Sequence, residues 1–284
     1  IKVIVDEEEQ ITESDEDNNV EAEDITVSYP PILLLDDDNS GNNGGYRTET
    51  DSYYANALDN LTNPIAYDII RVNSSADAPE IGILSEYQMI IWVCGTDYQS
   101  GDTDVTFTDN DKSNVAEYLE DGGAMWVVGM DILYDFDTSD GDRSAGDFEH
   151  DYLGVSYADN DRATPAVVYG VDDDPISDGV EYNADAISSD FADDINPRSG
   201  FEKVLSSNGD YNISTIRTED EFKLVFMTID FSSITSSEDR DEFMENVVEY
   251  LVEQLENDVS LSRFNTPKDE ETVEPNVENI VNVT

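Results

Sequence analysis

The sequence is poor in cysteine and histidine, and each shortage excludes a class of protein. Among the 284 residues, Cys94 is the one cysteine and His150 the one histidine. No intrachain disulfide can therefore form, and the two side chains cannot supply the closed nitrogen and sulfur shell of a structural zinc site. Cys94 lies inside the apolar run MIIWVC at 89–94, where a cysteine is usually a small buried hydrophobe.

Basic residues are so few that the chain carries an extreme negative charge. Thirteen Lys and Arg stand against 68 Asp and Glu, and the formal net charge at pH 7 is −55. Such a chain repels nucleic acids and anionic membranes, so neither is expected as a partner. Its self-repulsion destabilises a compact fold unless cations screen it. The composition therefore predicts adaptation to brine (a halophilic protein) or to a surface rich in divalent cations, with an ordinary acidic protein as the alternative.

Long apolar runs are also missing. No stretch approaches the roughly 18–20 apolar residues of a transmembrane helix, and no segment has the pattern of a signal peptide, so no membrane span is expected. The chain begins at Ile1, which we interpret as a processed protein or a piece of a longer one. Hydrophobic residues still make up 38% of the sequence, enough to form a substantial core in a chain of this length.

Sequons for N-glycosylation, of the form N-x-S/T, occur along the chain. The candidate glycosylation sites are Asn60, Asn73, Asn212 and Asn282. In a chain rich in Asn, Ser and Thr, chance supplies some of these matches, so they are a modest indication. They favour an extracellular or cell-surface location, which we predict.

Three parts are expected along the chain. Residues 1–28 are predicted to be an extended acidic segment with a short strand at 1–5, because blocks of like charge stay solvated. Residues 258–284 are predicted to be an extended tail, whose last part at 277–283 has a strand-like pattern. Between them, residues 29–257 contain apolar strands that alternate with amphipathic helices.

This middle part predicts an α/β fold. The expected strands are 32–35, 66–72, 89–94 and 124–128, followed by less regular ones at 166–169, 213–218 and 223–229. The expected helices are 52–61, 111–120 and 238–255. Strands that are apolar on both faces and alternate with helices predict a mainly parallel sheet covered on both sides. The right-handed crossover rule then gives a doubly wound, three-layer sandwich.

Several stretches follow one another in an order typical of a known superfamily. They are PILLLDDD (31–38), SYYANAL (52–58), YQMIIWVCGT (87–96), EYLEDGGAMW (117–126), DYLG (151–154), DPISDG (174–179) and the segment 231–251. Over roughly residues 30–256, this order resembles the class I glutamine amidotransferase superfamily. The resemblance implies a flavodoxin-like α/β domain of the non-catalytic kind found in large secreted or cell-surface archaeal and bacterial proteins, often beside extracellular peptidases.

The chain departs from catalytic members of that superfamily at the nucleophile. In those members a cysteine occupies a Gly-x-Cys-x-Gly turn after the fourth strand, whereas the matching stretch here is VGMDI at 128–132, with Met130 in the cysteine's place. A thioether cannot be activated for acyl transfer. Pairing His150 with Cys94 or with a serine would need a turn and an orienting acid that the sequence does not mark. We therefore predict that the chain is not an enzyme.

Clusters of aspartate are the candidate metal ligands. The stretch DDDNSG at 36–41 matches half of an EF-hand loop, but the twelfth position is Arg47 where that loop needs Glu. A looser oxygen cage at the strand ends, where open α/β sheets bind ligands, would let calcium relieve repulsion among carboxylates. The alternative is a solvated acidic face. The predicted calcium ligands are Asp36, Asp37, Asp38, Asp131, Asp135, Asp137 and Asp142.

Three kinds of function are considered. The first is a non-enzymatic structural or interaction subunit of an extracellular assembly, such as a filament, sheath or surface layer, which associates with itself or with other surface proteins. The second is an accessory domain of a secreted hydrolase such as a peptidase, and the third is a hydrolase in its own right. The missing nucleophile, the sequons and the acid load favour the first. The strand-like segments at 1–5 and 277–283 would either pair with a sheet edge of another copy or fold back on their own domain.

Overall fold

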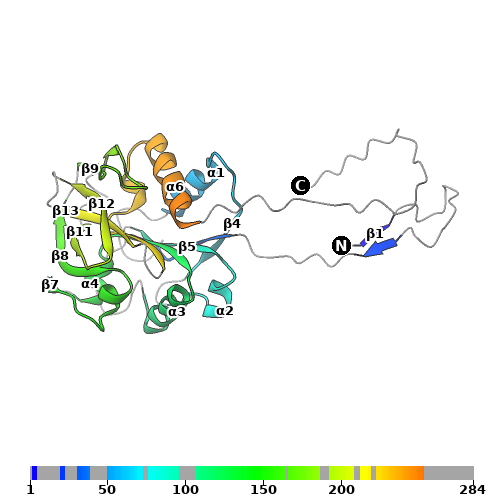
Figure 1. Cartoon of the computed structure of the whole chain (residues 1–284), viewed down its shortest axis with the longest axis horizontal. Coiled ribbons are helices and arrows are strands. Elements are labelled where there is room, and N and C mark those ends of the chain that lie inside the picture. The colour runs from blue at the N-terminus through cyan, green and yellow to red at the C-terminus, as the bar shows by residue number, and fades with distance from the viewer. Residues whose placement is uncertain are drawn as a thin grey trace. The chain divides into compact units, whose positions relative to one another are not determined.

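A computed structural model describes most of the chain up to Val252 (Figure 1). The described residues are 2–4, 20–22, 31–38, 50–72, 76–95, 107–137, 139–163, 166–185, 192–207, 212–218 and 222–252. The chain divides into two units, and the second, Glu253–Thr284, lies outside the described residues. The predicted strand at 277–283 and the sequon residue Asn282 lie in that unit. The sequon residue Asn73 and the side chain of Asn212 are also outside the described part.

One half of the large nine-stranded sheet is parallel. Its strands are β3 (Ile32–Asp36), β4 (Tyr67–Arg71), β5 (Met89–Gly95), β6 (Ala124–Gly129) and β14 (Lys223–Met227). They lie in the order β14-β6-β5-β3-β4, and every neighbouring pair is parallel. β3, β5 and β6 are buried along their whole length, as expected of apolar strands covered on both faces.

The other half of the sheet is antiparallel, and the predicted fold class is wrong for this reason. Beyond β14 the order continues through β13 (Asn212–Thr218), β12 (Phe201–Ser207), β9 (Val167–Tyr169) and β10 (Glu181–Asn183), each antiparallel to the last. A separate antiparallel sheet contains β11 (Ala192–Pro197), β8 (Val155–Ala163) and β7 (Gly141–Asp142). The sheet is mixed, and the fold is not a mainly parallel three-layer sandwich.

The segments that connect the strands explain why the predicted parallel sheet was wrong. A parallel neighbour needs a crossover of a dozen or more residues, usually a helix, whereas antiparallel strands can be joined by a short turn. In the described residues no helix lies between β8 and β14. The alternation of strand and helix that holds up to about residue 136 does not continue through this stretch, so the parallel pattern does not extend to it.

Helices cover both faces of the nine-stranded sheet (Figure 1). One face carries α1 (Asp51–Asp59), the 3₁₀ turn η2 (Phe231–Ser233) and α6 (Ser237–Leu251). The other carries α2 (Ile81–Leu84), α3 (Asp109–Glu120), α4 (Ile132–Phe136) and α5 (Phe148–Asp151). Because side chains alternate along a strand, Ile32 and Leu34 enter the first core while Leu33 and Leu35 enter the second.

The predicted helices are present with small shifts at their ends. α3 begins two residues earlier than expected because Thr108 and Asp111 form a capping box, in which each side chain accepts a hydrogen bond from the other's backbone N–H. α6 begins after Ser236, whose hydroxyl accepts from the backbone N–H of Asp239. In the described residues no helix is long and apolar enough to cross a membrane.

The strand expected at 1–5 is present as β1 (Lys2–Ile4). It pairs in an antiparallel ladder with β2 (Val20–Ala22), which lies in the acidic segment. The described partner of β1 therefore belongs to the same chain.

Candidate functional site

Buried acidic side chains gather at the carboxyl ends of the parallel strands. One is the last residue of β3, two follow that strand, one follows β6 and one follows β14, and each is at most 7% exposed. Because these strands are parallel, their carboxyl ends meet at one edge of the sheet, which is the edge where open α/β sheets bind ligands. The residues are Asp36, Asp37, Asp38, Asp131 and Asp230, and we call them the strand-end acids.

Asp38 ties the end of β3 to the start of α1. Its Oδ2 accepts hydrogen bonds from the backbone N–H and the Oγ1 hydroxyl of Thr50, at 2.8 and 3.1 Å. Gly95 allows this close approach, because a Cβ at that position would lie 2.6 Å from the Cβ of Asp38, and its φ of +69° also suits glycine. The sequence places both features where β3, β5 and α1 meet.

Asp36 shares one arginine with a second buried carboxylate. The guanidinium of Arg71, at the end of β4, lies 3.2 Å from Asp36 Oδ2 and 2.5 Å from Asp51 Oδ2. The Arg71 side chain is 61% exposed, so it lies over the two carboxylates from the solvent side. Burial, together with the charges of Asp38 and Asp51, raises the pKa of Asp36 to about 7. Neither Asp51 nor Arg71 was predicted from the sequence as a site residue.

Cys94 lies beneath the strand-end acids and is wholly buried. Burial, with the charges of Asp37, Asp135 and Asp230, raises the pKa of its thiol well above the ordinary value. The thiolate is the reactive form of cysteine. Because the raised pKa lowers the fraction of thiolate, this environment makes Cys94 a poor nucleophile. Burial likewise raises the pKa of Asp37, although its Oδ2 accepts a hydrogen bond from Trp92 Nε1 at 3.0 Å.

Asp230 completes the group from the side of β14. Its Oδ1 accepts from the backbone N–H of Ser232 at 2.8 Å, and its Oδ2 accepts from the Tyr54 hydroxyl of α1 at 3.1 Å. Burial raises the pKa of Asp230. Asp230 was not predicted as a site residue, although it follows the strand expected at 223–229 just as Asp36 follows the strand expected at 32–35. That shared position was the available signal.

The turn after β6 places an aspartate in a strained conformation. Asp131 has φ 55° and ψ 10°, in the left-handed region, between β6 and α4. For a residue with a side chain this costs roughly 1–2 kcal/mol. Met130, which the predicted resemblance aligns with the nucleophilic cysteine, is the preceding residue and is fully buried. At this strand end the chain therefore offers a carboxylate and a thioether.

The other predicted calcium ligands lie in different surroundings. Asp137 and Asp142 are exposed; Asp137 Oδ1 accepts from the backbone N–H of Ser139 at 2.9 Å, and its Oδ2 lies 4.0 Å from Arg143. Arg143 is buried and pairs with Glu149 at 3.1 Å. Within the described ranges, no group of three or more His, Cys, Asp or Glu side chains is arranged to hold a metal ion. The calcium ligands stay a prediction.

His150 contacts an acid of its own helix. Its Nδ1 lies 2.7 Å from Asp151 Oδ1, and this interaction lowers the pKa of Asp151. Arg198 donates to the backbone oxygens of both residues, at 2.8 and 3.0 Å. The contacts found for His150 thus hold α5 to the chain that follows β11.

Comparisons with known proteins give fold-level matches at low identity. No protein-family model and no curated protein matches the chain. A cytoplasmic protein from Salmonella typhimurium matches at 15% identity over 78% of this chain and 98% of its own, with a TM-score of 0.48. A putative GMP synthase component from Thermoplasma acidophilum matches at 13% identity over 79% and 97%, with a TM-score of 0.47.

A third match is a polyextremophilic β-galactosidase from the Antarctic haloarchaeon Halorubrum lacusprofundi. It is 11% identical over 80% of this chain, with a TM-score of 0.48, and the match spans 31% of the β-galactosidase. Likenesses at this level carry no argument about activity or substrate. The resemblance to the class I glutamine amidotransferase superfamily stays a prediction.

The raised pKa of Asp36 predicts how stability depends on pH. The pKa of Asp36 is about 7 in the folded chain, against 3.8 for an unperturbed aspartate. Because the folded state holds the proton more tightly, the free energy of unfolding should fall as pH rises from 3.8 through about 7. Asp36→Asn cannot ionise, so we expect the variant to lose this part of the decline. The measurement is urea unfolding of both proteins across that pH window at constant high salt.

Asp51→Asn is the matched control for this experiment. It removes the other partner of Arg71 but leaves Asp36 able to ionise. Because the charge of Asp51 helps to raise the pKa of Asp36, we expect the control to keep the decline and to shift it to lower pH. If the free energies of unfolding of Asp36→Asn and of the unmodified chain change with pH by the same amount, Asp36 does not titrate in this window.

Proposed function

We propose that this chain is a non-enzymatic structural or interaction domain of an extracellular assembly, adapted to high salt or to calcium. The observation that carries the proposal is the chemistry of the strand ends. The side chains gathered there are buried carboxylates around a thiol whose ionisation is suppressed. Ionisation of such closely spaced carboxyls is opposed by burial and mutual repulsion, which cations relieve, and the chemistry at Cys94 is the reverse of what an activated nucleophile needs.

The bonds of the strand-end acids support the same proposal. Asp38 holds Thr50, Asp37 accepts from Trp92 and Asp230 accepts from Tyr54. A catalytic carboxylate must be within hydrogen-bond reach of the proton that it moves on a substrate. These carboxylates are directed to groups of the fold, where they join the ends of strands to the helices that cover them.

The described sequon supports the extracellular part of the proposal. Asn60 follows α1 and is exposed, as is Thr62. The Asn60 amide donates to Asp241 of α6 at 3.0 Å, and the Thr62 hydroxyl donates to Glu245 at 2.8 Å. An exposed asparagine of this kind meets the surface requirement for N-glycosylation.

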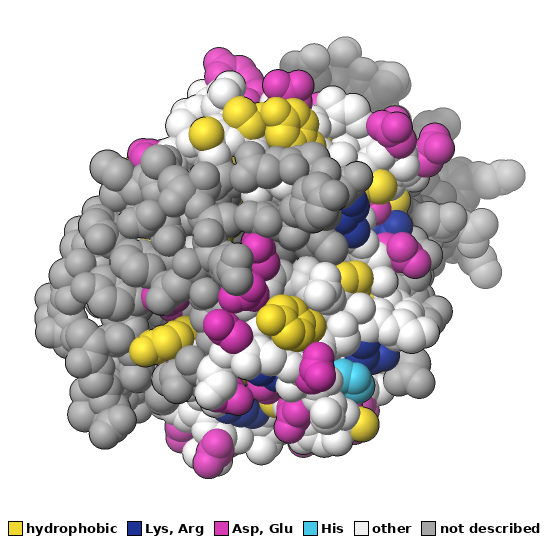
Figure 2. Space-filling view, turned by 90° about the vertical axis from the view of Figure 1, so that its left-hand side faces the viewer, with side chains coloured by type: hydrophobic (Ala, Val, Ile, Leu, Met, Phe, Trp, Pro, Cys, Tyr) yellow, Lys and Arg dark blue, Asp and Glu magenta, His cyan; other side chains and the backbone are white. Residues whose placement is uncertain are grey.

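The distribution of charge supports the salt adaptation. Figure 2 shows acidic side chains spread across one face of the described part, with few basic side chains among them. On a chain of net charge −55, acidic side chains repel one another at low ionic strength. Screening by concentrated salt or neutralisation by divalent cations therefore acts on the whole domain.

Direct imaging of the purified chain tests the proposed function. In concentrated salt, with and without calcium, we expect electron microscopy and light scattering to detect particles much larger than a monomer. Particles no larger than a dimer at every salt and protein concentration would contradict the assembly proposal. A hydrolytic activity that Cys94→Ala abolished, with the fold intact, would contradict its non-enzymatic part.

A further inference from the structure

β4 is the terminal strand of the nine-stranded sheet, and β3 is its one strand neighbour in the part of the chain that the structure describes. Val72 donates its backbone N–H to the carbonyl oxygen of Asp36 on β3 at 2.8 Å. Successive residues of a strand turn their backbone groups to opposite sides. The backbone N–H and C=O groups of the even-numbered residues of β4 therefore point toward β3. Those of the odd-numbered residues point away from β3, toward the edge of the sheet.

Among the odd-numbered residues of β4, the middle one, Ile69, has an apolar and exposed side chain. Ile69 is 37% exposed, and the other exposed large hydrophobic residues among those described are Ile83 at 42% and Tyr169 at 39%. Sheet edges in proteins are normally protected by charge, by proline or by a covering element. An exposed isoleucine at the centre of an edge strand is instead suited to pairing with another strand.

The residues of β4 itself carry no net charge, in a very acidic chain. Its sequence YDIIR has one acid and one base, whereas the whole chain has a net charge of −55. The Arg71 guanidinium lies at this edge, where it bridges Asp36 and Asp51. A second copy of the chain would therefore meet less repulsion here than at a surface of average composition.

The strand is complementary to itself when a second copy runs antiparallel to it. With Ile69 opposite the second copy's Ile69, Tyr67 lies opposite Arg71 and Asp68 lies opposite Ile70. All outward-facing residues then form hydrogen-bonded pairs, and no like charges lie opposite each other. A shift of the register toward the N-terminus would place Asp68 opposite Asp68, which is destabilising.

We propose that β4 pairs with β4 of a second copy in this register, and so joins two nine-stranded sheets across a two-fold axis. The interface is isologous, because the same strand serves both copies. It rests on the proposed function, since it specifies one contact through which the chain associates with itself. High salt is its condition, because two highly negative copies approach closely only when the Debye length is short, about 3 Å near ~1 M.

Cysteine cross-linking tests the register. The Cα atoms of a hydrogen-bonded antiparallel pair lie about 5.5 Å apart, within the range that a disulfide spans. Cys94 is buried, so Ile69→Cys adds an accessible thiol at the centre of the strand. In concentrated salt with a mild oxidant such as copper–phenanthroline, we expect Ile69→Cys to form a covalent dimer. Ile83→Cys, the matched control on α2, is expected to remain monomeric.

Ile69→Pro tests the hydrogen bonds of the same interface. The Ile69 N–H faces away from β3, so proline removes a donor to the second copy and leaves the ladder to β3 intact. We expect circular dichroism to show that the variant folds, and light scattering to show that it lacks the dimer expected of the unmodified chain. Ile69→Ala, which keeps the N–H, is expected to weaken the dimer without abolishing it.

The outcomes separate this interface from the proposed function. If large particles form but Ile69→Cys cross-links no better than Ile83→Cys, the β4 interface is wrong and the assembly proposal stands. If Ile69→Cys gives the dimer but no larger particle appears, the interface stands and the assembly proposal fails. A chain that stays monomeric, with no cross-link for either variant, contradicts both.

Discussion

The chain is expected to unfold when monovalent salt is lowered from about 1 M to about 0.01 M. Over that range the Debye length grows from about 3 Å to about 30 Å, so each carboxylate comes to interact with many others. The net charge of −55 makes this repulsion act on the whole domain. Trp92 and Trp126 are fully buried in the two opposite cores, so a red shift of tryptophan emission during the titration would report unfolding of both.

The same titration with calcium separates binding from screening. If the predicted aspartates form discrete sites, millimolar calcium at low ionic strength should restore the fold, with a gain of about 2.7 kcal/mol when calcium exceeds its Kd a hundredfold. Magnesium at equal ionic strength is the control, because its smaller, octahedral shell fits such loose cages poorly. A melting temperature that responds neither to salt nor to chelator would contradict both the halophilic and the calcium interpretations.

The parallel half of the fold could be predicted because its signal is local. β3, β5 and β6 are short runs of apolar residues, and a strand of this kind can be stable only inside a sheet covered on both faces. The helices between them have their own periodicity and caps. The antiparallel half has a weaker signal: strands were expected at 166–169 and 213–218, but not at β10, which has three residues, and the pairing of these strands depends on contacts between separate segments of the chain.

The same distinction holds for the strand-end acids. Asp36, Asp37 and Asp38 were predicted as a cluster because they follow an apolar strand directly. Asp230 joins them through a contact with Tyr54, which is 176 residues away in the sequence, so only the fold brings it to this edge. The raised pKa of Asp36 depends on burial, which the composition of a very acidic chain does not reveal.

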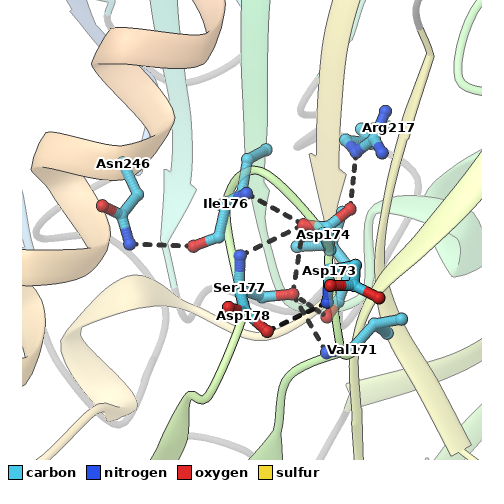
Figure 3. A network of polar contacts seen from close by, with 9 residues as sticks. Val171, Asp173, Asp174, Ile176, Ser177, Asp178, Arg217 and Asn246 are labelled. Carbon is cyan, nitrogen blue, oxygen red and sulfur yellow. Dashed lines mark hydrogen bonds and ion pairs between the residues drawn. The ribbon is translucent and has the colours of Figure 1, made fainter.

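A second buried network holds the antiparallel half to α6 (Figure 3). Asp174 is its centre: Oδ1 accepts from the backbone N–H groups of Ile176 and Ser177, at 2.9 and 3.1 Å, and from the Ser177 hydroxyl at 3.1 Å. Its Oδ2 lies 2.7 Å from Arg217 Nε of β13. Asn246 of α6 donates to the carbonyl oxygen of Ile176 at 2.9 Å. One carboxylate thus joins the turn before β10 to a central strand and, through that turn, to the last helix.

Arg217→Met is expected to lower the free energy of unfolding by about 3–5 kcal/mol, because it leaves a buried carboxylate without its cationic partner. The side chains of Arg217 and Asp174 are 8% and 3% exposed, so water cannot replace the lost charge. Urea unfolding in concentrated salt measures the loss.

Lys223→Met is the matched control. The Lys223 ammonium lies over the same Tyr250 ring as the Arg217 guanidinium, at 5.9 against 5.3 Å, but Lys223 is only half-buried. Adding Asp174→Asn to Arg217→Met should recover part of the loss, because the double variant has no buried charge left to neutralise. A loss no larger for Arg217→Met than for Lys223→Met would mean that stacking on Tyr250, and not the ion pair, accounts for the contribution of Arg217.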